Sequence, residues 1–62
     1  MTNEELKKAL FEETPVKFGG ITYEKVTAII YRKKENGVAV SAELLDRCKN
    51  SVTIAEAERV ER

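Results

Sequence analysis

The spacing of apolar side chains changes once along the chain, near Pro15, and divides the sequence into a helical and a β-rich segment. Thr2 stands three residues before Glu5, which is the spacing of a capping box at a helix N-terminus. Pro15 ends the helical pattern, because the residue before a proline is pushed out of the α region. The pattern predicts a helix over residues 2–13. Its apolar residues recur at helical spacing: Leu6, Ala9, Leu10 and Phe11.

From Val16 onward apolar and polar residues alternate, which is the period of a β-strand. Gly19-Gly20 predicts a turn that tolerates positive φ between two short strands. The longest β signal is the run 26–34, rich in β-branched and aromatic residues, and alternation resumes after Asn36-Gly37. Asn36-Gly37 is the strongest hairpin signal in the chain, so we expect a long central hairpin there.

Two registers of this hairpin are open. If Asn36-Gly37 is a two-residue loop, Glu35 pairs with Val38, and Ile29 and Tyr31 lie on the inner face. If the loop has three residues and a bulge at Gly37, Lys34 pairs with Val38, and Ile29 and Tyr31 project outward. We favour the second register because it gives the more continuous apolar inner face. That face comprises Val26, Ala28, Ile30, Val38, Val40, Ala42 and Leu44.

The segment after Ala42 has two interpretations. In the first, the high helix propensity of residues 42–45 and 55–58 leads to C-terminal helices, and the chain is an α+β domain with a central β-hairpin. The β-branched run 52–54 favours a strand instead, followed by a single helical turn and a last short strand. We favour a mainly β fold with one N-terminal α-helix: an SH3-like small five-stranded barrel over residues 15–62, joined to the helix in one domain, 1–62.

The order of these elements is typical of SH3-like small barrels. From Pro15 onward the chain also contains five characteristic segments: Pro15-Val16, Gly20-Ile21-Thr22-Tyr23, Ala28-Ile29-Ile30-Tyr31-Arg32, Glu43-Leu44-Leu45-Asp46 and Asn50-Ser51-Val52-Thr53-Ile54. In these segments the chain resembles a family of short, uncharacterised proteins from prophages and conjugative elements of Gram-positive bacteria. The resemblance implies the small-barrel fold and a place in a bacterial mobile element, but it brings no known activity.

The composition narrows the chemistry. The 62 residues include no His, so the commonest general base near neutral pH and the commonest zinc ligand are missing. The single cysteine, Cys48, has no partner for a disulfide or a resolving thiol, and no loop has the spaced oxygen ligands of a calcium site. We therefore expect no enzyme, no cofactor and no metal site.

The chain carries no sign of a membrane segment. No apolar run approaches the roughly 18 residues that span a bilayer, and the N-terminus is acidic and amphipathic where a signal peptide is basic and then apolar. We expect a cytoplasmic protein that does not bind membranes.

The functional expectation is a non-enzymatic interaction module that binds an unknown protein partner or itself. In the favoured register Ile29 and Tyr31 form an exposed apolar pair that a second copy of the chain could cover. The net charge is zero, so there is little electrostatic repulsion between copies, and we expect a homodimer. The alternative is a small nucleic-acid-binding barrel in which Tyr23 and Tyr31 stack on bases beside the basic hairpin residues Arg32, Lys33 and Lys34. We do not favour it, because nucleic-acid-binding domains usually carry a clear basic excess.

Overall fold

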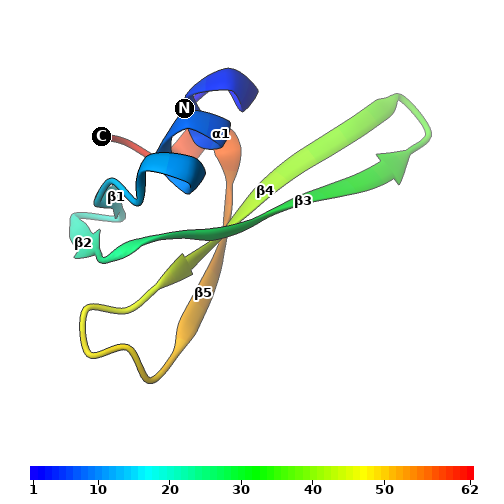
Figure 1. The fold of residues 1–62 in the computed structure, drawn as a ribbon. Coiled ribbons are helices and arrows are strands. Elements are labelled where there is room, and N and C mark those ends of the chain that lie inside the picture. Colours follow the sequence, from blue (N-terminus) through cyan, green and yellow to red (C-terminus); the bar gives the residue numbers. More distant parts are fainter.

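The computed structural model describes all residues, 1–62, and is mainly β with one N-terminal helix, as predicted. Strands β1 and β2 form a two-stranded sheet, and β3, β4 and β5 form an antiparallel three-stranded sheet in that order (Figure 1). The two sheets do not close into a barrel. The predicted alternative with C-terminal helices is wrong. In chain order the elements are α1 (Asn3–Glu12), β1 (Val16–Phe18), β2 (Ile21–Tyr23), β3 (Lys25–Lys34), β4 (Gly37–Leu45), β5 (Val52–Glu56) and the 3₁₀ turn η1 (Ala57–Arg59).

Helix α1 begins at the predicted capping box. The Glu5 N–H donates to the Thr2 hydroxyl at 3.2 Å, and the Thr2 N–H donates to the Glu5 carboxylate at 2.9 Å. The N–H groups at the start of a helix have no carbonyl partner within the helix, and the capping box pairs two of them, those of Thr2 and Glu5. The helix ends at Glu13, whose φ of 55° is left-handed, just before Thr14-Pro15. The predicted start and stop of the helix are both confirmed.

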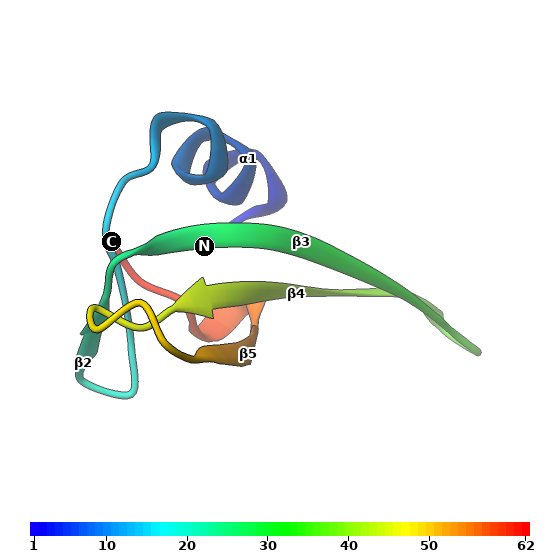
Figure 2. The ribbon, with the colours of Figure 1, turned by 60° about the horizontal axis from the view of Figure 1, so that its bottom comes forward.

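The hydrophobic core lies between α1 and one face of the three-stranded sheet, and Figure 2 shows α1 lying along β3. Leu6 and Ala9 are the buried residues of the helix, while Phe11 is 82% exposed and does not extend the apolar face as predicted. Four of the ten core residues are alanines, so the helix and sheet approach closely and the core has little volume. The core comprises Leu6, Ala9, Val16, Tyr23, Val26, Ala42, Leu44, Ala55, Ala57 and Val60.

The central hairpin exists, but its pairing matches neither predicted register. The first register is nevertheless right about the faces, since Ile29 and Tyr31 pair with Ala42 and Val40 on the inner face. Lys34 pairs with Gly37, so the two-residue loop is Glu35-Asn36, and Gly37 is the first residue of β4 with a φ of 133°. Only glycine adopts that φ readily, which explains why the Asn-Gly signal marks the hairpin without lying at the centre of its loop.

A β-bulge at Thr27 then shifts the pairing, because Val26 pairs with Leu44 while Ala28 pairs with Glu43. One extra residue on β3 reverses which side chains face the core. Val26 and Ile29 therefore both face inward, although they are three positions apart. Ala28 and Ile30, predicted inward, lie on the opposite face, and Val38 is 62% exposed.

The two ends of the chain are bound to each other. The ammonium group of Met1 donates to the carbonyls of Ala57 and Val60, each at 2.7 Å. Lys17 of β1 exchanges two backbone hydrogen bonds with Glu61, at 2.7 and 2.8 Å. These contacts join the helix, β1 and the C-terminal residues on one side of the larger sheet.

The observed register predicts unequal costs for two truncations on the central hairpin. Leu44→Ala removes a fully buried side chain and should lower the free energy of unfolding by about 2 to 5 kcal/mol. Ile30→Ala removes a side chain on the uncovered face and should cost about 1 kcal/mol or less. Equilibrium denaturation in urea measures both, and a larger loss for Ile30→Ala would contradict the register.

Candidate interaction surfaces

The face of the three-stranded sheet opposite α1 carries an apolar patch, which we call the outer face. Residues that pair across neighbouring strands have their side chains on the same face of the sheet. Glu43 of β4 pairs with Ala28 on one side and with Ile54 on the other, so all three side chains are on this face. Leu45 and Val52, which pair with each other, are on it as well. Val52 is 50% exposed and Ile54 is 49% exposed. None of the apolar side chains of this face belongs to the core cluster. The patch comprises Ala28, Ile30, Leu45, Val52 and Ile54.

One polar pair interrupts the outer face. The Thr27 hydroxyl donates to the Glu43 carboxylate at 2.8 Å, and it also lies 3.3 Å from the Glu43 carbonyl oxygen. The bulge brings Thr27 to this position. Glu43 thus has a hydrogen-bond partner within the chain, which lowers the cost of removing it from water.

Ile29 and Tyr31 do not form the outward-facing pair that the favoured register predicted. Ile29 packs against the core. Tyr31 is 52% exposed, but its hydroxyl donates to the Asn3 side-chain oxygen at 2.8 Å, at the start of α1. The pair lies on the face that the helix covers.

Tyr23, predicted to stack on bases, lies in the core opposite Val16 and is 8% exposed. The predicted basic residues are all exposed at the hairpin tip, but they divide between the two faces. Lys33 pairs with Val38, whereas Arg32 and Lys34 pair with Ala39 and Gly37 on the other face. The structure brings Arg32 and Lys34 together and separates them from Tyr23.

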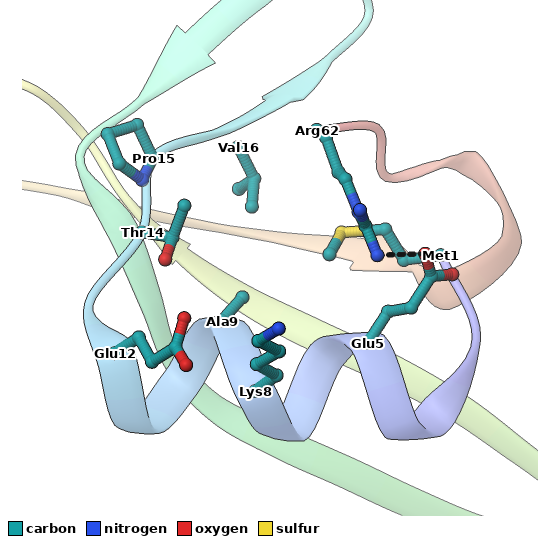
Figure 3. A pocket seen from close by; sticks show the side chains of 9 residues that line it. All are labelled: Met1, Glu5, Lys8, Ala9, Glu12, Thr14, Pro15, Val16 and Arg62. Carbon is teal, nitrogen blue, oxygen red and sulfur yellow. Dashed lines mark hydrogen bonds and ion pairs between the residues drawn. The ribbon is translucent and has the colours of Figure 1, made fainter.

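A cavity of about 260 Å³ lies between α1 and the segment before β1 (Figure 3). Glu5 and Lys8 project toward it from the helix, and Val16 closes its apolar side. Arg62 crosses its edge to form an ion pair with Glu5. The ion pair joins the C-terminus to the first turn of the helix, and we assign the cavity a structural role.

The rest of the polar surface contains no cluster of potential metal ligands. No three His, Cys, Asp or Glu side chains lie together as metal ligands. Cys48 is exposed in the turn after β4, where its N–H donates to the Asp46 carboxylate at 3.3 Å. No helix has the length and apolar character that crossing a membrane requires.

A comparison of the chain with family models, curated proteins and solved structures gives no significant match. The surfaces of the structure are therefore the basis for inferring a function.

The capping box predicts a pH dependence of stability. The Thr2 N–H bonded to the Glu5 carboxylate, with the Thr2 hydroxyl and Arg62 beside it, holds the pKa of Glu5 below its ordinary value of 4.5. A lowered pKa in the folded state stabilises the protein above pH 4.5, and this stabilisation disappears as the pH falls through the folded-state pKa.

Glu5→Gln should therefore be less stable than the wild type at pH 7, and the difference should be smaller at pH 3, because glutamine preserves the cap but does not titrate. Urea denaturation at both pH values measures the difference. Glu4→Gln is the control, because Glu4 lies in the same turn without capping it. Equal pH dependence of the two variants would contradict the assignment to the capping box.

Proposed function

We propose that this protein is a small non-enzymatic interaction module that self-associates as a dimer through the outer face of its three-stranded sheet. The observation that carries the proposal is the half-exposed pair Val52 and Ile54, which continues the apolar surface of Ile30 and Leu45 on a face that α1 does not cover. Exposed contiguous apolar patches on small soluble proteins are typical of protein interfaces.

Symmetry and charge support a dimer over binding to one dedicated partner. A two-fold contact buries the same patch on both copies and is the commonest form of self-association. The formal net charge of zero adds little long-range repulsion between copies. Two carboxylates lie beside Ile54 on this face, and both have partners: Glu43 is hydrogen-bonded to Thr27, and Glu56 is 3.6 Å from Arg59.

The proposal includes an open SH3-like arrangement and a cytoplasmic role in a bacterial mobile element, as the family resemblance implies. In support of the arrangement, η1 is followed by the Glu61–Lys17 bridge, which brings the chain end back to β1. This is the order of elements expected of an SH3-like chain, although here the sheets stay open.

Ile54→Glu tests the dimer. Sedimentation equilibrium at tens of micromolar should give a mass of about 14 kDa for the wild type, twice the 7.0 kDa of one chain. Ile54→Glu should bring the mass to about 7 kDa, because it places a charge at the centre of the interface. Ile21→Glu is the matched control, since Ile21 is 58% exposed on the other sheet and should leave the dimer intact.

A wild-type mass of 7.0 kDa would contradict the dimer. Dissociation by Tyr31→Glu together with a stable Ile54→Glu dimer would instead assign the interface to Ile29 and Tyr31, on the helix-covered face.

A second candidate function is binding of single-stranded nucleic acid by the hairpin tip. The observation in its favour is that none of the ion pairs of the chain involves Arg32, Lys33 or Lys34. Against it, the buried ring of Tyr23 is not available for stacking on bases.

We expect no complex with single-stranded DNA or RNA tighter than tens of micromolar at about 150 mM salt. Fluorescence anisotropy over a range of salt concentrations measures the affinity. A submicromolar complex whose salt dependence flattens when all three basic residues are replaced would establish nucleic-acid binding in place of our proposal.

A further inference from the structure

The β3–β4 hairpin extends beyond the rest of the sheet and leaves part of β4 without a neighbour on one side. The last pair between β4 and β5 joins Ser41 to Glu56, and the chain then leaves the sheet as η1. Figure 1 shows the hairpin tip projecting past the end of β5. Residues 37–40 therefore form a free strand edge.

The backbone groups of Val38 and Val40 point out of this edge. An antiparallel strand directs the N–H and C=O groups of alternate residues toward its two neighbours. The Leu45 carbonyl accepts from Glu24 on the β3 side, at 2.8 Å, and the Asp46 N–H donates to Ser51 on the β5 side, at 2.9 Å. Counting back in steps of two from Asp46 places Val38 and Val40 on the β5 side, where β5 has already ended.

The free edge borders a groove of about 680 Å³. Its other lining residues are Met1 and Asn3 at the start of the chain, Ile54 and Glu56 at the end of β5, and Ala57 and Glu58 of η1. The groove continues the line of β5 and has strand backbone along one side, which is the setting in which an extended segment adds to a sheet.

Two cations line the groove from the far strand. Arg32 and Lys34 belong to β3, but their partners on β4 are Ala39 and Gly37, whose side chains are a methyl group and a hydrogen atom. The long side chains pass over these small residues and line the groove, whereas Lys33, on the opposite face, does not.

The charges favour an acidic occupant over a second copy of this edge. Arg32 and Lys34 form no ion pair within the chain and lie along the β4 side of the groove. Of the two carboxylates that line it, Glu56 is 3.6 Å from Arg59, and Glu58 belongs to η1, away from β4. Two copies paired edge to edge would bring Arg32 and Lys34 close to their counterparts, and like charges across a sheet repel.

We infer that the free edge of β4 binds an extended segment of another protein in which apolar and acidic residues alternate. The segment adds antiparallel to β4, as β5 does, so that its apolar side chains lie beside Val38 and Val40 and its acidic side chains meet Arg32 and Lys34. The site borders the outer face, on which Ile54, Arg32 and Lys34 lie, but its main contact is the backbone edge of β4, and it goes beyond the proposed self-association.

A synthetic segment of about six residues in which Val and Glu alternate is the probe, and the same segment with Lys in place of Glu is its control. Chemical shifts of the ¹⁵N-labelled protein, followed in a titration to about 1 mM, report affinity and location together. We expect the Val–Glu segment to shift the amides of residues 37–40 and to bind about tenfold more tightly than the Val–Lys segment.

Protein variants separate the charge from the backbone contribution. Lys34→Glu should reverse the preference between the two segments, whereas Lys33→Glu makes the same change on the other face and should preserve it. Val38→Pro removes the Val38 N–H, which points to the free edge and forms no hydrogen bond with β3. The protein should therefore stay folded, and the affinity for the segment should fall about tenfold.

Methylation of the segment tests the same contacts without changing the protein. In the antiparallel arrangement the Val N–H groups of the segment face β4, and the Glu N–H groups face away. N-methylation at Val should abolish binding, and N-methylation at Glu should not.

Absence of binding at about 1 mM, equal binding of the two segments, or equal effects of the two methylations would overturn the inference. Val52→Glu changes the outer face at a residue that does not line the groove, so it should disrupt the proposed dimer and still bind the Val–Glu segment as the wild type does. A failure of the proposed dimer and a failure of this site therefore give different results.

Discussion

The β-bulge at Thr27 is the constraint on which the rest of the structure depends. A strand alternates strictly, so Val26 and Ile29 can both reach the core only if one residue between them is left out of the pairing. The bulge supplies that residue. From it follow the outward direction of Ile30, the place of Tyr31 beside α1, and the position of Arg32 and Lys34 on the face away from α1.

The length of the chain determines how much of this sheet is covered. A domain of 62 residues has one helix here, and that helix covers one face of the three-stranded sheet. The alanines of the core let α1 lie close to the sheet, and the hydrogen bonds of the Met1 ammonium hold the start of the chain against its end. The outer face has no helix over it and is exposed to solvent or to another molecule. The chain has only enough residues to cover one face, and the uncovered face is the proposed interface.

Features with a local cause could be predicted from the sequence. The Thr2–Glu5 capping box, the end of α1 before Pro15, the Gly19-Gly20 turn and the existence of the central hairpin all follow from neighbouring residues. The register could not be predicted for two reasons. Asn36-Gly37 does not determine which two residues form the loop, and the burial of both Val26 and Ile29 depends on packing with other elements that no short window contains. Tyr23 was misassigned for a related reason: it alternates with Ile21, yet Tyr23 is buried and Ile21 is exposed, since only one end of β2 meets the core.

The hairpin tip combines an exposed backbone edge with charges that decide what can pair with it. A free edge is a template for any extended chain, including a second copy, and basic side chains are a common protection against such pairing. Arg32 and Lys34 disfavour pairing between two copies of this edge, because each copy brings the same two positive charges and these repel one another. The same pair attracts an acidic strand, so one feature disfavours self-pairing and favours a partner of opposite charge. The outer face has no comparable unpaired charge at its centre, since Glu43 is bonded to Thr27, and it is the surface better suited to a symmetric contact.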